Sequence, residues 1–339
     1  MRALRKVDPD GGLVLTELPQ PVPGPGELLV RVRVSGLCGT DLSIVRWADY
    51  VRPFVVLPRT LGHELVGVVE AVGPETSIPV GTRVTADSDG GCGVCRWCQR
   101  GLRNACERQS RIGTQRDGAL ADLVIVPERS IHPIPDAVSD RAACLLEPFG
   151  AAMRAVERLT LAPGGSAAVI GPGPVGLLAA VALEESGYEP VLMVGLDKDT
   201  ARLDVARGLG FEAVVTARAA ERAALLGPLD GVDVVVDAVG SADSLVLAIE
   251  MARFGGQIAV VGLGQGGTVD PSRVVAKELT VVGSWRRLPT TWDRTLAILS
   301  RRADLEALVD GLYALDRHEE ALAAVAAGAH IKTALLINP

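Results

Sequence analysis

The chain has 339 residues, of which 48% are hydrophobic and 22% charged, a composition typical of a globular protein of about two domains and not of a disordered chain. The formal net charge of −7 leaves no positive excess for a nucleic-acid backbone, so no nucleic-acid partner is expected. No apolar run reaches the roughly 20 residues that a bilayer requires, and the first residues lack the apolar core of a secretory signal. We therefore expect a cytoplasmic protein without a membrane partner.

The first third of the chain is predicted to form short antiparallel strands. In residues 28–34 valines alternate with arginines, which is the period of a half-buried strand. Further apolar strands are expected at residues 65–72 and 121–126, separated by Gly, Pro and Asp. The Pro- and Gly-rich run at residues 21–26 predicts a turn, because it cannot continue a helix or a sheet. This pattern favours a small barrel or sandwich.

From about residue 148 the pattern changes to alternating helices and apolar strands, which predicts a parallel, doubly wound sheet covered on both faces. The predicted strands are residues 167–170, 191–194, 232–237 and 257–261, and the predicted helices are residues 150–159, 175–186, 201–209 and 244–252. After about residue 284 the alternation ends. Helices are then expected at residues 294–301 and 319–327, before a closing strand at residues 333–337, and this tail is compatible with a return to the first domain.

Four of the six cysteines fall in one short segment, at Cys92, Cys95, Cys98 and Cys106. In a reducing compartment such a cluster indicates a metal rather than disulfides, and its spacing lets four thiolates converge on a structural zinc with no open position. An iron–sulfur cluster uses the same ligands. Four reduced thiols without metal are a further alternative, which is disfavoured because exposed thiols so close together oxidise readily. The lobe is expected to span about residues 88–108.

A Gly-Pro-Gly-Pro-Val-Gly run follows an apolar strand and opens a helix, the context in which such a fingerprint indicates dinucleotide binding. Gly171 allows the tight turn, Gly173 lets the backbone approach a pyrophosphate, and Gly176 lets the helix pack on the strand. The helix begins with Pro174 and Val175, and its first amides are expected to face the phosphate. A glycine-rich turn without a ligand is the alternative.

The end of the next predicted strand bears on the choice between NAD and NADP. A carboxylate that binds the ribose hydroxyls of NAD is expected at this point, but Asp197 comes slightly late. Gly195 leaves room for a 2′-phosphate, and Lys198 and Arg202 are cations that can pair with one. These residues favour NADP.

Further metal-ligand side chains occur in two segments of the first domain and at the domain junction. Cys38, His63 and Glu147 supply a thiolate, an imidazole and a carboxylate, which suit an open zinc site. Spacing alone does not show that the three side chains converge. A lone histidine such as His63 is also more often a core residue than a metal ligand.

Together these motifs resemble the zinc-dependent medium-chain alcohol dehydrogenases, especially the branch of sorbitol, threonine and related polyol or aminocyclitol dehydrogenases. The likeness includes the fingerprint, the four-cysteine lobe, Gly-Leu-Cys-Gly-Thr-Asp at 36–41, Gly-His-Glu at 62–64, Leu-Glu-Pro at 146–148 and Val-Val-Gly-Ser at 281–284. It implies an α/β fold with two domains and a substrate in the cleft between them. These are a chaperonin-like β-barrel catalytic domain, residues 1–147 and 287–339, and a Rossmann domain with a doubly wound parallel sheet, residues 148–286.

The resemblance implies that Cys38, His63 and Glu147 hold a catalytic zinc, while Glu64 is a nearby carboxylate that can enter the coordination sphere. Zinc would act as a Lewis acid that lowers the pKa of the substrate alcohol, and a hydride would then move to the nicotinamide. With the lobe, this implies two zinc ions per chain, one catalytic and one structural.

The family likeness also assigns the proton path. Asp41 resembles the carboxylate that fixes the tautomer of His63. Thr40 resembles the hydroxyl that passes the substrate proton. Ser43 stands where many relatives place the histidine that ends the relay, and because serine has no pKa near 7 it can relay a proton only through water.

Other positions are expected to shape the two ligand sites. The nucleotide site is predicted to include Val239, Gly262, Leu263 and Ser284. Trp47, Arg52 and Trp285 are expected close to the substrate, with ordinary packing or surface as an equal alternative. Cys144 is interpreted as a small buried hydrophobe rather than a ligand.

The sequence thus predicts a zinc-dependent NAD(P) oxidoreductase acting on a secondary alcohol, or the matching ketone, of a polyol, sugar or aminocyclitol-type small molecule. One alternative is a zinc-free enone reductase of the same superfamily, which the three predicted ligands argue against. The other is a nucleotide-binding relative with a regulatory or structural role and no dehydrogenase activity. Relatives are dimers and tetramers, so the resemblance also implies a homo-oligomer.

Overall fold

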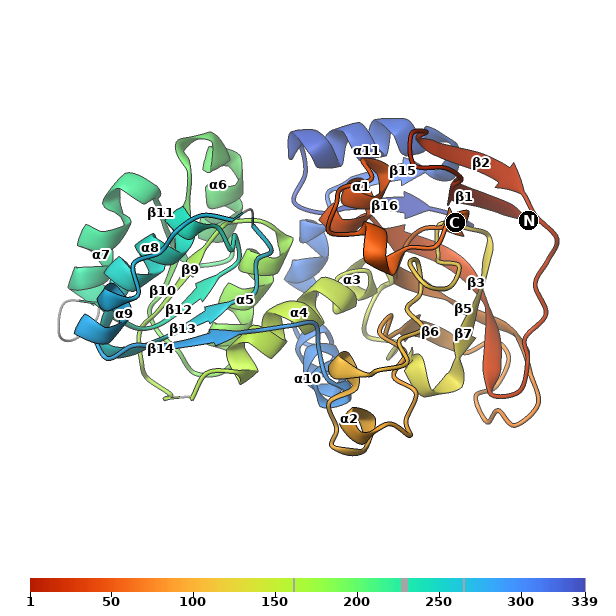
Figure 1. Cartoon of the computed structure of the whole chain (residues 1–339), viewed down its shortest axis with the longest axis horizontal. Helices are drawn as coiled ribbons and strands as arrows, with labels where there is room; N and C mark the ends of the chain where they lie inside the picture. The colour runs from red at the N-terminus through yellow and green to blue at the C-terminus, as the bar shows by residue number, and fades with distance from the viewer. Residues whose placement is uncertain (161, 227–230, 265, 339) are drawn as a thin grey trace. The chain divides into compact units, whose positions relative to one another are not determined.

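The computed structural model describes residues 1–160, 162–226, 231–264 and 266–338. These residues form two compact units (Figure 1). The first comprises Met1–Glu147 and Leu288–Pro339, and the second comprises Pro148–Arg287. The second unit is therefore continuous in sequence, whereas the first is assembled from two separate segments.

The first unit is built on a mostly antiparallel sheet, which within the described residues has the strand order β15-β16-β3-β5-β6-β8, with β7 paired to β3. A smaller sheet has the order β2-β1-β4. The strands are β1 (Arg2–Lys6), β2 (Leu13–Glu17), β3 (Glu27–Gly36), β4 (Arg59–Thr60), β5 (Glu64–Val72), β6 (Arg83–Ala86), β7 (Leu123–Pro127), β8 (Ile131–Pro133), β15 (Gly311–Ala314) and β16 (Thr333–Leu336).

Strand β3 connects most of this unit, because it pairs with β5 along its length, with β7 over its first residues and with β16 over its last. Val30 and Val32 are fully buried while Arg31 and Arg33 are exposed, as the alternating pattern predicted. At the far end, Gly36 is paired with Ala334. The tail therefore does rejoin the first domain.

The helices of the first unit are short and frame the sheet. They are α1 (Gly39–Val45), α2 (Arg96–Gln99), α3 (Asp140–Ala143), α10 (Pro289–Leu299) and α11 (His318–Ala327). The two predicted tail helices correspond to α10 and α11. Helix α10 begins five residues earlier than predicted, because Pro289 is accommodated in its first turn, where no amide donor is needed.

The second unit is a parallel sheet whose described strands run in the order β11-β10-β9-β12-β13-β14. Its elements are β9 (Ala167–Ile170), β10 (Val191–Gly195), β11 (Glu212–Val215), β12 (Val232–Asp237), β13 (Ala252–Val260), β14 (Thr280–Gly283), α5 (Pro174–Glu184), α6 (Thr200–Gly208), α7 (Ala219–Leu226), α8 (Ala242–Met251) and α9 (Ser272–Ala276). Helix α4 (Leu146–Glu157) runs across the boundary between the units. The predicted doubly wound sheet is confirmed.

Burial follows the sequence pattern in this unit. Every residue of β9 and β10 is buried, which is why these strands appear as unbroken apolar runs. Edge strand β14 is mostly exposed. None of the described helices combines the length and the apolar character needed to cross a membrane.

Candidate catalytic site and metal centres

Three side chains of the first unit meet at the junction of β3, α1 and β5. Cys38 precedes α1, His63 immediately precedes β5, and Glu64 is the first residue of β5. One ligand atom from each of the three lies within 4.8 Å of the other two. The structure therefore brings the predicted thiolate and imidazole together, with Glu64 as the carboxylate of the group.

Asp41 contacts both segments that carry the side chains of this cluster. Its carboxylate accepts hydrogen bonds from the backbone amides of Cys38 at 3.0 Å and Gly62 at 3.3 Å, and its Oδ1 lies 3.5 Å from Nδ1 of His63. Asp41 is fully buried, so these contacts fix both segments that carry the candidate ligands. The contact at Nδ1 leaves Nε2 of His63 as the nitrogen available for a metal.

Gly62 explains why the chain can turn into this arrangement. Its φ of 91° is a conformation that side chains disfavour. A Cβ atom at this position would lie 2.8 Å from the backbone nitrogen of Leu120, which is closer than packing allows. In the Gly-His-Glu motif the backbone therefore requires the glycine, while the other two residues supply side chains to the cluster.

The ionisable groups of the cluster favour a bound cation. Burial opposes protonation of His63, but the charge and hydrogen bond of Asp41 outweigh it and raise the pKa of His63 well above its usual value. Although burial disfavours its ionised form, Asp41 beside His63 has a lowered pKa. Burial, together with the charge of Glu147, raises the pKa of Glu64. A cation placed among these groups would relieve the crowding of negative charge.

The other predicted residues of the catalytic site lie at different distances from the cluster. Glu147 is outside the group of three, although its charge acts on Glu64. The Thr40 hydroxyl is 3.8 Å from the Cys38 sulfur. The Ser43 hydroxyl donates to the carbonyl of Gly39, one helical turn back, at 2.9 Å. Thr40 is thus adjacent to the candidate metal ligands, whereas Ser43 hydrogen-bonds within its own helix.

Cys144 is buried, as the sequence predicted for a small hydrophobe, and it does not belong to either cysteine-containing ligand group found among the described residues. Burial and the charge of Glu64 raise its pKa to about 12, so it is a neutral thiol at ordinary pH.

Sequence reasoning missed Lys332, which pairs with Glu64. Both side chains are buried, and Nζ donates to Oε1 of Glu64 at 2.6 Å. A lysine that immediately precedes an apolar strand was the available signal. Its partner is 268 residues away in sequence, so no local pattern connects the two.

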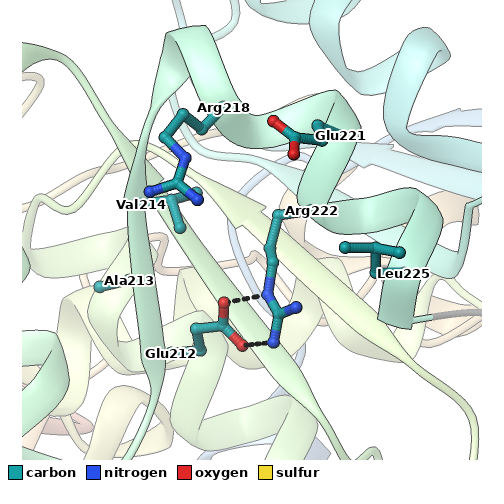
Figure 2. Close-up of a pocket in the computed structure, with 7 residues that line it drawn as sticks. All are labelled: Glu212, Ala213, Val214, Arg218, Glu221, Arg222 and Leu225. Atoms are coloured by element: carbon teal, nitrogen blue, oxygen red, sulfur yellow. Dashed lines mark hydrogen bonds and ion pairs between the residues drawn. The ribbon is translucent and has the colours of Figure 1, made fainter.

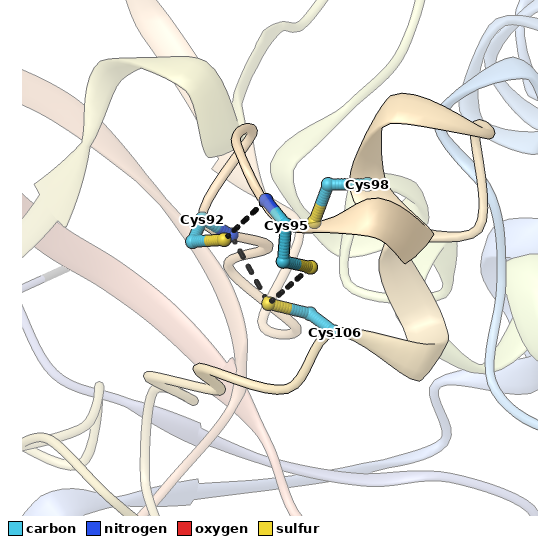
Figure 3. A group of neighbouring side chains, drawn as sticks. All are labelled: Cys92, Cys95, Cys98 and Cys106. Atoms are coloured by element: carbon cyan, nitrogen blue, oxygen red, sulfur yellow. Dashed lines mark hydrogen bonds between the residues drawn. The ribbon is translucent and has the colours of Figure 1, made fainter.

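The four predicted lobe cysteines converge around α2, as Figure 3 shows. Their sulfur atoms lie within 4.8 Å of one another. Backbone amides of Cys92 and Arg108 donate to the sulfur of Cys106, and the amide of Cys95 donates to that of Cys92, each at 3.3 Å. This donor set of four thiolates supported by amides suits a tetrahedral metal with no open position.

The thiols of the lobe titrate unequally. Hydrogen bonds from backbone amides lower the pKa of Cys95 to about 6, whereas burial raises the pKa of Cys98 to about 12. A thiolate such as Cys95 is the protonation state that binds a metal, and a metal would deprotonate the remaining thiols.

The dinucleotide fingerprint in the second unit has the geometry that each glycine was predicted to permit. Gly171 has a φ of 99°. A Cβ atom at Gly176 would lie 1.8 Å from the carbonyl oxygen of Gly171, so helix α5 packs directly on the turn. A Cβ atom at Gly173 would meet nothing within 4 Å, so space is open beside the start of α5. These features suit a pyrophosphate on the helix amides.

Gly195, the last residue of β10, is also tightly packed. A Cβ atom there would lie 2.9 Å from Cγ of Pro172 and 3.1 Å from Cδ2 of Leu203. A carboxylate side chain at this position would therefore have to displace the side chain of Pro172, which belongs to the fingerprint turn, or that of Leu203. Asp197 and Lys198 follow on an exposed single turn, and Arg202 lies in α6.

The remaining predicted nucleotide residues lie at the carboxyl ends of strands β12, β13 and β14. Asp237 anchors the first of these loops, because its buried carboxylate accepts hydrogen bonds from the amides of Val239 and Gly240, each at 2.9 Å. Gly262 and the exposed Leu263 follow β13, and the buried Ser284 follows β14. Dinucleotides bind at this edge of open parallel sheets.

A separate cavity of about 340 Å³ lies between β11 and α7 (Figure 2). It is lined by Glu212, Ala213, Val214, Arg218, Glu221, Arg222 and Leu225. Arg222 makes a paired interaction with the Glu212 carboxylate across it. None of the predicted nucleotide residues lines this cavity, so it is not part of the predicted nucleotide site.

Three residues expected near the substrate are distributed over the two units. Trp47 packs against the core of the first unit and has a φ of 52°. Arg52 donates to the carbonyl of Trp47 and pairs with Asp49. Trp285, in the second unit, is half exposed and lies under the guanidinium of Arg286. Whether they contact substrate stays a prediction.

Two family models match the chain. The model described as "Alcohol dehydrogenase GroES-like domain" matches residues 24–136, and the model described as "Zinc-binding dehydrogenase" matches residues 174–301. The chain is 32% identical to an L-threonine 3-dehydrogenase from Sinorhizobium medicae over 334 residues, which cover 97% of this chain and 96% of the relative.

Solved structures give the same likeness. A zinc-binding dehydrogenase from Sinorhizobium meliloti, bound to NADP, has a TM-score of 0.89 and 26% identity over 99% of both chains. The 2R,3R-butanediol dehydrogenase from Bacillus subtilis has a TM-score of 0.88 and 27% identity, again over 99% of both chains. The expected barrel and Rossmann folds are thereby confirmed, and the chain belongs to the zinc-dependent medium-chain alcohol dehydrogenase family of NAD(P)-linked oxidoreductases.

Proposed function

We propose that this protein transfers a hydride between NAD(P) and a secondary alcohol or ketone of a small polar molecule, with a catalytic zinc held by Cys38 and His63. The observation that carries the proposal is the convergence of Cys38, His63 and Glu64 within 4.8 Å, with Asp41 fixing the imidazole. A thiolate and an imidazole that converge beside a carboxylate suit a catalytic zinc. The same three residues argue against a zinc-free reductase.

Glu147 is proposed as the third ligand, with Glu64 beside it. The charge that Glu147 exerts on Glu64 supports two carboxylates near one cation. The lobe cysteines are proposed to hold a second, structural zinc, because four thiolates complete a tetrahedral shell. Metal analysis of the purified protein tests this, with about two zinc ions per chain expected.

The residues of the cluster have separate tasks in this proposal. Cys38 and His63 would hold a zinc ion that supplies Lewis-acid chemistry at the oxygen of the substrate, which would lower the pKa of the alcohol. Asp41 keeps the His63 ring in one orientation and tautomer through its contact at Nδ1. The Thr40 hydroxyl, next to Cys38, accepts the proton of the substrate hydroxyl and passes it to water. A nicotinamide cofactor, held by the fingerprint of the second unit, would supply or accept the hydride.

The substrate class follows from a feature shared by named relatives. L-threonine and 2R,3R-butanediol each carry a secondary hydroxyl beside a carbon that bears an amino or hydroxyl group. Polyols, sugars and aminocyclitols have the same pair. We therefore propose a substrate with a secondary alcohol next to a second polar substituent.

NADP is proposed as the preferred nucleotide. Gly195 ends β10 without a carboxylate that would bind the ribose hydroxyls of NAD and repel a 2′-phosphate, and Asp197 comes two residues later. Lys198 lies in the single turn that follows β10, and Arg202 lies in the first turn of α6. Solved relatives include one bound to NADP and one bound to NADH, so the proposal rests on this chain's own residues. The ratio of kcat/KM for NADP+ and NAD+ tests this choice, and a ratio below one would refute it.

The decisive experiment offers NAD+ and NADP+ to the zinc-replete protein with L-threonine, butanediols, sugar alcohols, inositols and aminocyclitols. Formation of reduced nicotinamide with one class, and its loss in the Cys38→Ser variant, would support the proposal. Turnover that persists in both Cys38→Ser and His63→Ala would refute the zinc mechanism. Turnover with enones alone would indicate the zinc-free reaction instead.

A homo-oligomer is also proposed. Strand β14 forms an edge of the parallel sheet, and Val281 on it is 39% exposed. An uncovered edge can pair with another copy of itself. Light scattering on the eluting protein tests this, and a mass of one chain at micromolar concentration would refute it.

A further inference from the structure

Lys332 and Glu64 form a buried ion pair beside the catalytic cluster. Their side chains are 3% and 1% exposed, and Nζ lies against both carboxylate oxygens, at 2.6 Å from Oε1. Removing both charges from water is costly, and pairs of this kind add little to stability compared with apolar packing. Their place in the fold therefore calls for another explanation.

The pair links the two segments that carry the candidate zinc ligands. Nζ of Lys332 also donates to the carbonyl of Leu37, the residue before Cys38, at 2.9 Å. Glu64, its ionic partner, follows His63. Lys332 thus binds next to both ligands without belonging to the ligand group itself.

The backbone of Lys332 is held in place as well. Oδ1 of Asp310 accepts hydrogen bonds from the amides of Ile331 at 2.9 Å and Lys332 at 3.2 Å. The amide of Gly311 donates to the carbonyl of Lys332 at 3.2 Å. The ammonium group is therefore presented to the cluster from a fixed point at the start of β16.

Gly36 provides a recess for the Glu64 carboxylate. A Cβ atom at Gly36 would lie only 2.0 Å from Oε2 of Glu64, so any larger residue would displace the carboxylate. Oε2 is buried and lies against Nζ of Lys332. Glu64 is thus held by two independent features, the ion pair with Lys332 and the Gly36 recess.

We propose that Lys332 is a positioning residue that, with the Gly36 recess, holds Glu64 off the catalytic metal and so keeps one ligand position open for the substrate. The proposal rests on the proposed function. A catalytic zinc needs an open position, and the Glu64 carboxylate lies within 4.8 Å of the other ligand atoms. Without a counter-cation, this buried carboxylate would turn to the nearest remaining one, which is the metal.

The test uses the full-length protein with Co²⁺ in place of zinc. The visible absorption of Co²⁺ weakens when its coordination expands from four to five ligands, a change that zinc sites also make. The spectrum of the Cys38→Ser variant, in which Co²⁺ remains in the lobe alone, is subtracted. The rate of Co²⁺ release to a chelator provides a second readout.

Lys332→Met is expected to weaken the absorption of the catalytic Co²⁺, slow its release about tenfold or more, and lower kcat. Gly36→Ala should give the same spectrum by a different route, because it displaces the carboxylate but leaves Lys332 intact. Adding Glu64→Gln to either variant should restore the original spectrum and release rate. Lys332→Arg, which keeps the positive charge, is the matched control and should retain both.

An unchanged Co²⁺ spectrum in Lys332→Met and Gly36→Ala would overturn the proposal. So would a changed spectrum that Glu64→Gln fails to reverse, because Lys332 would then act on the fold and not through Glu64. If Lys332→Met does not fold, Gly36→Ala with and without Glu64→Gln decides by the same criteria. Equal Co²⁺ binding by the parent protein and Cys38→Ser would refute the catalytic metal, and the proposed function with it.

Discussion

The lobe and the catalytic cluster are both candidate metal centres of the same unit, yet they are built from opposite kinds of contact. In the lobe, four chemically identical thiols from a single segment converge, and neighbouring amides donate to their sulfurs. In the cluster, three side chains of different chemistry come from two segments, one before α1 and one around the start of β5, and Asp41 and Lys332 hold them. The lobe needs few other parts of the chain, whereas the cluster depends on distant ones.

This difference separates a closed site from an open one. Four thiolates complete the shell of a zinc ion, so the lobe can stabilise its segment but leaves no position for a substrate. The mixed ligands of the cluster are oriented by second contacts, and such contacts are needed where a position must stay open. Substitutions in the two regions should therefore fail in different ways.

The largest expected effect is on turnover, from substitution of Cys38. Cys38→Ser should lower kcat/KM about a thousandfold or more, because the Lewis acid that it helps to hold is worth several kcal/mol to the transition state. Zinc content should fall from about two ions per chain to one, and thermal stability should change little. Cys144→Ala, which removes a buried thiol of this unit that lies outside both ligand groups, serves as the control for metal content. Full activity in Cys38→Ser would show that the cluster is not the catalytic metal centre, and the contrast with the structural lobe would be lost.

Asp41→Asn should have the next largest effect. It keeps the size of the side chain but weakens the acceptor that orients His63, so metal affinity or kcat should fall by about 10- to 100-fold. The lobe metal should be unaffected, which metal analysis after mild chelation would reveal. A parallel loss from both centres would show that Asp41 supports the unit as a whole.

A lobe substitution should affect stability instead of chemistry. Cys106→Ser removes a sulfur that accepts two amide hydrogen bonds, and losing the lobe metal at a cost of about 3 kcal/mol would lower Tm by roughly 6–12 °C. Initial rates measured well below the new Tm should stay within about threefold of the original, a difference under about 1 kcal/mol. An immediate loss of turnover at low temperature would contradict this division of roles.

The smallest effect is expected at Ser43. Its hydroxyl donates to the Gly39 carbonyl within α1, so Ser43→Ala should change kcat by less than about threefold, equivalent to under about 1 kcal/mol. The pH profile of kcat, compared between the two proteins, is the measurement. A tenfold fall in kcat would show that the serine does relay protons and would enlarge the catalytic cluster by one residue.

Much of the fold could be predicted because its pattern is local. The apolar strands β9, β10 and β12 are bounded by clear breaks, and their alternation with helices was enough to predict a parallel sheet. Short elements were missed where the pattern is brief or mixed. Helix α1 has seven residues, and β15 mixes buried and exposed positions within four.

The candidate site was predictable to the extent that its residues occur in recognisable motifs. The four lobe cysteines lie in one segment, and the structure brings them together. Lys332 has no motif, because its role depends on a strand pairing between residues far apart in sequence. The proximity of Glu64 to Cys38 and His63, closer than that of Glu147, also depends on how β5 enters the sheet. Spacing in sequence carries no information about such distances.

The pairing of Gly36 with Ala334 has a consequence for biosynthesis. On the ribosome, residues 1–147 emerge long before the strand that completes their sheet, while the continuous second unit can fold as soon as it is made. Until β16 and Lys332 arrive, Glu64 lacks the ammonium group with which it pairs in the folded unit. The nascent protein should therefore acquire its Rossmann unit first, and the catalytic unit should close around its metal ligands only as the last strand docks.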